Sequence, residues 1–312
     1  MGEDMMGFVR KNKATFFLLI NAFLWGSSYI WSKMLLGYLP RFAILFICSL
    51  GGLVSTALFF FPSIREMKKS AILPSMLVSV FSIISNTLSM FALQYTSSSN
   101  AAFIVQMSVV ITPLIMALLE RKIPKMGTVA GVAAAMTGVF MLTCDFRAFC
   151  FNTGDVFALG NALFFSLFLV GQKVFSGKVK TIHFAFIYHM TNTTAFFILS
   201  FAFERHIIDF GRMASPVFGL LALAGIFVSV VTALLQTSAI KHASPEKAAL
   251  VYTVEPVTTL ILGHLLLGET INGIKPAVGC LLILISVLCS GFGTKSGEME
   301  PKSRENPTVT VS

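Results

Sequence analysis

The chain has 312 residues, of which 55% are hydrophobic and only 12% are charged. Its mean hydropathy of +0.83 excludes an ordinary soluble domain, and the apolar stretches leave no room for a soluble catalytic domain. The formal net charge of +9 at pH 7 raises nucleic-acid binding as one explanation, which the placement of the charges tests.

Apolar stretches follow one another along the chain, each close to the roughly 20 residues that a helix needs to cross a bilayer. We predict ten spanning helices, at residues 14–32, 42–61, 72–92, 98–119, 126–143, 155–175, 182–203, 215–239, 245–267 and 274–292. With five spans in each half, the second half enters the membrane in the opposite orientation. The expected fold is an all-α polytopic membrane protein of two inverted five-helix repeats, an arrangement typical of secondary transporters.

The two repeats occupy residues 14–143 and 155–292 in this interpretation. Residues 1–13 are expected to form a cytoplasmic N-terminus, and residues 293–312 a disordered cytoplasmic tail. This topology places seventeen Lys and Arg residues on the inner side and six on the outer side. The positive-inside rule then predicts a plasma membrane protein, in a bacterial inner membrane, with both termini cytoplasmic. The basic excess is a topology signal, and we expect no nucleic-acid partner.

The first predicted helix carries a stripe of polar and aromatic residues, Asn21, Trp25 and Tyr29, at positions i, i+4 and i+8. Trp and Tyr normally favour the membrane interface, whereas Trp25 lies in the middle of this span. The stripe fits the wall of a cavity that stacks a substrate. Ordinary helix packing beside the small residue Gly26 explains it equally well.

Internal sequence matches indicate a duplication. Lys33 recurs 140 positions later as Lys173, and Ser97 recurs 147 positions later as Ser244. Ser244 stands directly before Pro245, which is the position of a helix N-cap.

Pro113 and Pro256 are the two prolines that lie well inside predicted spans, the fourth and the ninth, which are equivalent in the repeat. Each removes the N–H that would bond the carbonyl four residues earlier, on Val109 and Tyr252. Helices interrupted at corresponding positions of two halves indicate a transporter binding site. The alternative is that each proline only kinks its membrane helix.

The seventh predicted helix has His189 near its middle. A histidine at this depth could relay protons near neutral pH, but it could also be a hydrogen-bonded structural group. Further amides lie in the middle of spans, where interhelical hydrogen bonds explain them although any two could line a polar pocket: Asn86, Gln106, Asn161 and Gln236.

Glu255 is the strongest single indication of a functional site, because it lies near the middle of the ninth predicted helix. A carboxylate at this depth costs roughly 2.5–3.5 kcal/mol, so it should face protein, water or substrate rather than lipid. Tyr252 and Thr259 are at helical spacing from it and could share its face. Glu255 could bind a cationic or amine-bearing substrate or carry a coupling proton. A structural carboxyl group bonded to a neighbouring helix is the alternative.

The sequence has no recognisable nucleotide-binding, catalytic or metal-ligand motif, so we expect no enzyme activity, catalytic residue, metal or cofactor. Gly127 and Gly131 form a GxxxG motif, which permits close helix contact within a chain or in a homodimer. Cys144 and Cys150 flank the loop between the repeats, and two nearby thiols leave their pairing open.

Several segments in this order resemble the EamA type of the drug/metabolite transporter superfamily. They are Leu24–Ser28, Thr96–Ile104, Val109–Leu114 followed by Arg121–Pro124, and Ala248–Leu250 through Glu255-Pro256 to Leu267–Glu269. The resemblance covers about residues 14–292. It implies a ten-helix basket that moves small metabolites or drugs by alternating access without ATP. The first repeat has no Glu equivalent to Glu255, which argues against a symmetric two-carboxylate mechanism.

We therefore expect a secondary transporter that exports a small metabolite or drug across the plasma membrane. The expected partners are a small-molecule substrate, the lipid bilayer, a coupling proton and a second copy of the chain. The site residues would be Glu255 as the ionisable group, with cavity-lining residues around it: Asn21, Trp25, Tyr29, His189 and Tyr252. An importer or exchanger of a nucleoside-like or amino-acid-like metabolite is the alternative within transport. A membrane-embedded enzyme and a non-transporting scaffold are the alternatives outside it.

Overall fold

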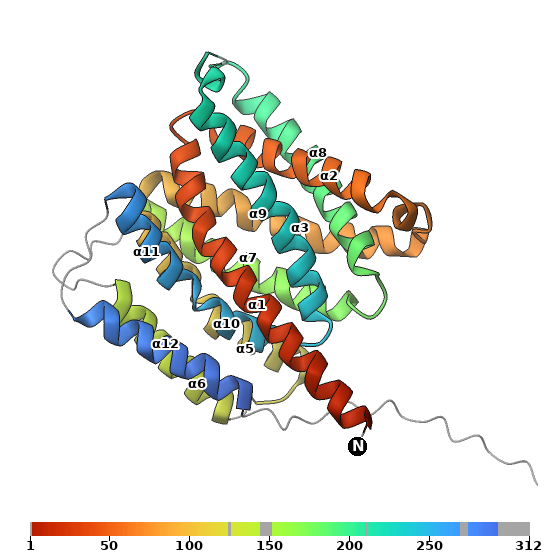
Figure 1. Ribbon diagram of the computed structural model, residues 1–312, viewed down its shortest axis with the longest axis vertical. Coiled ribbons are helices and arrows are strands. Elements are labelled where there is room, and N and C mark those ends of the chain that lie inside the picture. Colours follow the sequence, from red (N-terminus) through yellow and green to blue (C-terminus); the bar gives the residue numbers. More distant parts are fainter. Residues whose placement is uncertain (1, 124–125, 144–151, 210, 269–273, 293–312) are drawn as a thin grey trace, which may run out of the picture.

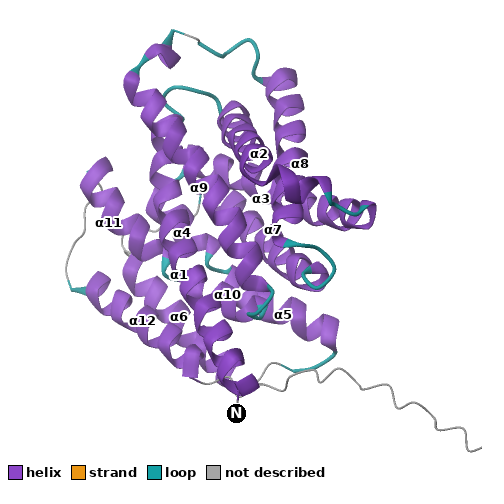
Figure 2. Cartoon of the chain, turned by 45° about the vertical axis from the view of Figure 1, so that its right-hand side comes forward, coloured by secondary structure: helices purple, strands orange, loops and turns teal. Residues whose placement is uncertain are grey.

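The computed structural model describes residues 2–123, 126–143, 152–209, 211–268 and 274–292, which form helices joined by short loops (Figures 1 and 2). The α-helices, in chain order, are α1 (Gly2–Leu35), α2 (Arg41–Arg65), α3 (Ile72–Tyr95), α4 (Ser98–Val105), α5 (Ser108–Glu120), α6 (Met126–Thr143), α7 (Thr153–Phe175), α8 (Thr181–Phe203), α9 (Pro216–Ile240), α10 (Pro245–Tyr252), α11 (Glu255–Leu267) and α12 (Lys275–Phe292). The described chain contains no β-strand.

These helices make ten spans, because α4 with α5 forms the fourth and α10 with α11 forms the ninth. By length and apolar composition alone, seven spans of the described chain qualify to cross a membrane. The 23-residue helix α8 is not among them, since His183, His189 and Asn192 lower its hydropathy. The all-α fold of two five-helix repeats is confirmed. The first helix is longer than we expected: α1 begins at Gly2, and its membrane-spanning part begins at Lys13.

The packing of the helices follows the repeat. Helix α2 packs along α8 and α6 packs along α12, so equivalent helices of the two repeats lie side by side (Figures 1 and 2). Helix α3 packs along α7, and the equivalent pair in the inverted arrangement, α9 with α1, packs in the same way. Helices α4 and α5 contact α11 and α10, respectively, at the centre. Each repeat is therefore completed by helices of the other.

Polar side chains fix the beginnings of several helices. Ser97 accepts a hydrogen bond from the N–H of Asn100 at 3.1 Å, and Ser244, which matches Ser97 in the repeat, accepts one from Lys247 at 3.3 Å. The predicted N-cap of the ninth span is thus confirmed. Asn152 forms a capping box with the third residue of α7.

The first backbone N–H groups of α2 donate to a carboxylate from a distant part of the chain. Glu204, which follows α8, accepts from the backbone N–H of Phe42 at 3.1 Å and of Ala43 at 2.9 Å, and lies 3.7 Å from the Arg41 guanidinium. Burial raises the pKa of the Glu204 carboxyl above its ordinary value, against the lowering effect of these three partners. This contact ties the end of α8 to the start of α2.

Two regions of interest lie outside the described residues. They hold the possible pair Cys144 and Cys150, and the tail that we expect to be disordered, residues 293–312.

Candidate functional site

The fourth and ninth spans break at equivalent positions. Helix α4 ends at Val105 and α5 begins at Ser108, while α10 ends at Tyr252 and α11 begins at Glu255. All four boundaries are related by the same shift of 147 residues that relates Ser97 to Ser244. The two breaks are thus a property of the repeat, and the helices on either side of them pack together, α4 against α11 and α5 against α10.

Each break is a tightened turn rather than an unwound segment. The N–H of Gln106 donates to the carbonyl of Phe103 at 3.0 Å, and the N–H of Thr253 donates to the carbonyl of Leu250 at 3.2 Å. These bonds reach back three residues instead of four, as in a 3₁₀ turn. The chain therefore changes direction at each break while keeping its backbone hydrogen-bonded.

The prolines explain one of the two breaks. Pro256 is the second residue of α11 and directly follows the break after Tyr252. Pro113 lies inside α5, which continues past it to Glu120. The expectation that Pro113 itself interrupts the fourth span is wrong, because the break precedes it, at Gln106 and Met107. The missing donor of Pro113 only leaves one carbonyl of α5 without its usual partner.

Glu255 is the first residue of α11 and is buried, with 3% of its surface exposed. Its Oε2 atom accepts a hydrogen bond from Nε2 of Gln106 at 3.4 Å. Gln106 belongs to the break of the fourth span, so the two breaks are joined by this contact. The other carboxyl oxygen of Glu255, Oε1, has no hydrogen-bond partner among the described residues.

The backbone of α1 lies against the start of α11. A Cβ atom at Gly26 would stand 2.6 Å from the carbonyl oxygen of Glu255 and 2.6 Å from Cβ of Thr258. Thr259 donates from its hydroxyl to the carbonyl of Gly26 at 2.9 Å. Only glycine permits this approach, which sets α1 directly beside Glu255.

One turn earlier, Asn21 begins a buried polar network. Its Nδ2 atom donates to the hydroxyl of Tyr252 at 2.9 Å, and that hydroxyl donates to Oε1 of Gln236 at 3.3 Å. Gln236 donates in turn to Gln172, whose amide donates to Thr237 at 3.2 Å. The network joins α1, α7, α9 and α10, and it fixes the Tyr252 ring next to the ninth-span break.

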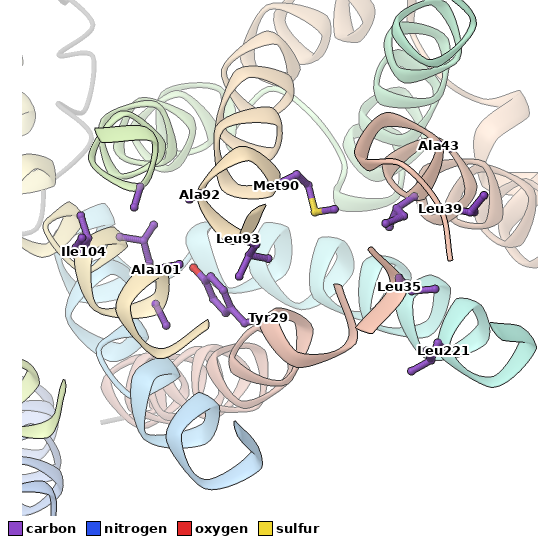
Figure 3. Close-up of a cluster of buried hydrophobic side chains, with 14 of the residues drawn as sticks. Tyr29, Leu35, Leu39, Ala43, Met90, Ala92, Leu93, Ala101, Ile104 and Leu221 are labelled. Atoms are coloured by element: carbon purple, nitrogen blue, oxygen red, sulfur yellow. The ribbon is translucent and has the colours of Figure 1, made fainter. Parts of the chain in front are cut away.

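Three aromatic rings pack together beside this network. Trp25 lies 5.1 Å from Phe165 and 5.1 Å from Tyr252, centroid to centroid, and Phe165 lies 5.9 Å from Tyr252. Tyr29 is buried on the same helix as Trp25, within electrostatic range of Glu255. Figure 3 shows the Tyr29 ring projecting from α1 between Leu93 and Ala101.

The unpartnered polar atoms near Glu255 share one chemical property. Buried side-chain oxygens of Asn21, Gln106 and Glu255 lack a donor within the described parts of the chain. With both amides donating through nitrogen, Asn21 to Tyr252 and Gln106 to Glu255, the atoms left without a partner are the oxygens. All three free atoms are acceptors. These three oxygens lack a hydrogen-bond donor, and Glu255 has no positively charged partner among the described residues.

The site does not include every residue that we expected. Asn21, Trp25, Tyr29, Tyr252 and Glu255 gather around the ninth-span break: the network and ring contacts join the first two to Tyr252, and Tyr29 lies within electrostatic range of Glu255. His189 lies on α8, which packs mainly on α2, α3 and α9. Its ring is buried against Gly52 of α2, and neither ring nitrogen has a hydrogen-bond partner in the described chain. The hypothesis that His189 lines the same cavity therefore receives no support from the packing.

Two site residues were not singled out from the sequence. Gln106 is one of several amides in the middle of spans that interhelical hydrogen bonds explain. Only its match to Thr253, 147 residues later and two residues before Glu255, could have distinguished it from the others. Phe165 carries no sequence signal that distinguishes it from the other 30 phenylalanines. Among the described residues, no three His, Cys, Asp or Glu side chains are grouped so that they could hold a metal ion.

Comparison with known proteins finds the same repeat. The chain matches the EamA-like transporter family twice, over residues 12–144 and 152–292. It is 25% identical over 280 residues to an uncharacterized transporter of Archaeoglobus fulgidus, an alignment that covers 90% of this chain and 86% of that protein. A protein of known crystal structure superposes with a TM-score of 0.71 at 17% identity, over 88% of this chain and 97% of the other. This last likeness concerns the fold alone.

Proposed function

The chain belongs to the EamA-like transporter family and is a membrane transporter, and from this premise we propose that it exports a small amine-bearing metabolite or drug in exchange for protons. Export proceeds by alternating access across the plasma membrane, with both termini in the cytoplasm. Glu255 binds the substrate ammonium group, and the rings of Trp25, Tyr29 and Tyr252 enclose its apolar part.

The observation that carries this proposal is the free carboxyl oxygen of Glu255 among acceptors that lack donors. An ammonium group supplies up to three N–H donors and one positive charge. It would satisfy Oε1 of Glu255, and a second N–H group suits the free oxygen of Gln106, whose amide already contacts this carboxyl. Aromatic faces beside the carboxylate favour a cation further through cation–π attraction. A carboxylate or phosphate substrate would meet the Glu255 carboxyl and the free oxygens of Gln106 and Asn21, none of which can donate to it.

Coupling to protons follows from the position of Glu255. An uncompensated carboxylate near the bilayer centre costs roughly 2.5–3.5 kcal/mol or more. Glu255 has no cationic partner in the described structure, so either a proton or the substrate ammonium neutralises it during each conformational change. A carrier that changes conformation only when Glu255 holds either a proton or the substrate ammonium moves the two in opposite directions. It therefore exchanges protons for substrate. Because bacterial plasma membranes hold a proton gradient directed inward, the exchange drives the amine outward.

Matching lysines close the two ends of the carrier. At the end where α3 finishes, Lys33 donates to the carbonyl of Thr96 at 2.7 Å, and Asn100 donates to Asp155 at 2.5 Å, which joins α4 to α7. By the charge asymmetry, this is the outer end.

At the opposite end, Lys173 donates to the carbonyls of Ile240 at 3.1 Å and Lys241 at 3.3 Å, so it caps α9 as Lys33 caps α3. Both contacts are present in the structure, in which Glu255 is buried. In our proposal, the Lys33 contact breaks to open the outer side and the Lys173 contact breaks to open the inner side.

Metabolite profiling tests the proposed function and identifies the substrate in the same experiment. Cells that express the wild type are compared with cells that express Glu255→Gln at equal membrane abundance, and both the cells and the spent medium are analysed. Glutamine has nearly the same shape and can still accept from Gln106, so the fold should persist. We expect an amine that accumulates in the medium only with the wild type. Accumulation inside cells would indicate an importer, and equal export by both proteins would exclude the assigned role of Glu255.

A further inference from the structure

An open surface cavity of about 490 Å³ lies at the C-terminal end of α5, away from the breaks. Its walls come from a single short stretch of chain: Leu114, Ala117, Leu118, Arg121, Lys122 and Ile123. The apolar side chains are highly exposed, with 54% of Leu114, 79% of Leu118 and 94% of Ile123 accessible. In a spanning helix these residues face lipid. The cavity therefore combines an apolar wall with two basic side chains at one membrane surface.

Arg121 has an unusual backbone conformation. Its φ of 52° and ψ of 40° are left-handed, and it is the sole non-glycine residue with positive φ in the described chain. Its N–H caps the carbonyl of Ala117, as does the N–H of Lys122 at 3.1 Å. The equivalent residue in the second repeat is Gly268, with φ 68°. Glycine adopts this conformation without strain, whereas arginine does so at an energetic cost.

The repeat provides an internal comparison. Part of the apolar wall is retained at the end of α11, where Ile261 and Leu265 match Leu114 and Leu118 and are also exposed, whereas Ile123 matches Thr270. The charges are not retained. The pair Arg121-Lys122 of the first repeat is replaced by Gly268-Glu269 in the second. Because the repeats are inverted, these two ends lie at opposite membrane surfaces.

The charge difference matches the lipid difference between the two surfaces. The positive-inside distribution puts Arg121 and Lys122 in the cytoplasmic leaflet, where anionic lipids give a negative surface potential. Neither side chain forms an ion pair with a described residue. Basic pockets beside membrane helices on the cytoplasmic side bind anionic headgroups.

We propose that the α5 cavity binds one anionic phospholipid of the cytoplasmic leaflet. Arg121 and Lys122 hold the phosphate, and the acyl chains lie along Leu114, Leu118 and Ile123. The left-handed conformation is retained at Arg121 because it presents the guanidinium beside this wall. The bound lipid anchors the end of α5, which is the cytoplasmic half of the interrupted fourth span. This proposal does not depend on the identity of the substrate.

Lipid titration of the purified full chain tests the proposal. The probe is dioleoyl phosphatidylglycerol, added to protein in neutral detergent, with dioleoyl phosphatidylcholine and inorganic phosphate as separate arms. The readouts are the thermal midpoint and the number of lipids retained in native mass spectrometry. Arg121→Gly and Arg121→Asn both suit the left-handed conformation, so they remove the charge while the helix end keeps its shape. Lys69→Gln removes an exposed basic residue from the same membrane face outside the cavity.

We expect phosphatidylglycerol alone to raise the thermal midpoint of the wild type and of Lys69→Gln, with one lipid retained. Both Arg121 variants and Lys122→Gln should bind it about fivefold more weakly. Arg121→Gly should also unfold at a higher temperature than the wild type without lipid, because its strain is relieved. An equal response of all variants to phosphatidylglycerol would overturn the proposal. So would equal effects of phosphatidylcholine, or a response to inorganic phosphate alone.

Discussion

Gly26→Ala tests whether the close approach of α1 to α11 holds the site together. The added Cβ would stand 2.6 Å from two atoms that cannot rotate away, the carbonyl oxygen of Glu255 and Cβ of Thr258. Close contacts between carbon and oxygen lie at roughly 3.3–3.6 Å, so α1 and α11 must separate by about 0.7–1.0 Å at this point.

The energetic effect has two opposing parts. Overpacking of a fitted contact costs about 1–3 kcal/mol, and replacing glycine by alanine inside a helix returns up to about 1 kcal/mol. We expect a net destabilisation of about 0–3 kcal/mol. The effect on function should be larger, because the displaced atoms belong to Glu255 itself and the hydrogen bond from Thr259 to Gly26 is stretched.

The assay compares Gly26→Ala with a matched change at Gly219 of α9, where an added Cβ meets no atom within 4 Å. Thermal unfolding in detergent measures stability, and the shift of the midpoint on adding the exported amine measures binding. Gly219→Ala should retain both. Gly26→Ala should lose most of the amine-dependent shift. Equal amine binding by the two variants would refute the idea that this contact positions Glu255.

Four further substitutions test other parts of the structure. Gln106→Leu removes the donor to Glu255 and should lower the free energy of unfolding by about 1–3 kcal/mol. Thermal unfolding measures this loss, and adding Glu255→Gln to the same chain should reduce it. Lys33→Met should speed amide hydrogen exchange around Thr96, and Lys173→Met should speed it around Lys241, at the opposite end of the protein. Faster exchange at the same end in both variants would contradict the assignment of one lysine to each end. The raised pKa of Glu204 means that the folded protein holds this proton more tightly than the unfolded chain, so stability falls as pH rises above 4.5 through the raised pKa. Glu204→Gln should flatten that slope in thermal unfolding followed against pH, and an unchanged slope would assign it to other groups.

The fold was predictable because its main signals are local. Twenty-residue apolar stretches and an odd number of spans per half specify the inverted repeat, since a bilayer leaves little choice of secondary structure. The N-cap at Ser244 followed from hydroxyl and proline chemistry within two residues. The position of the fourth-span break did not follow. Pro113 dominates the sequence pattern there, but the break precedes it, at Gln106 and Met107, between helices that pack against α11 and α10 of the other repeat.

The site was predictable in part. The stripe of Asn21 and Trp25 meets Tyr252 as helical spacing suggests, because residues four apart share one helix face. His189 has the same kind of sequence signal but lies between other helices. Which face of α8 turns toward which neighbour depends on packing over the whole bundle. Gln106 was hidden for the same reason, since its partner lies 149 residues away.

The central claim is that Glu255 exchanges a substrate ammonium for a proton. The most direct measurement uses proteoliposomes that enclose a pH-sensitive dye, to which the exported amine is added outside. We expect amine entry into wild-type vesicles to release protons from their interior at a fixed ratio, and Glu255→Gln vesicles to show neither movement. Amine uptake by Glu255→Gln, or uptake by the wild type with no change in internal pH, would contradict the claim.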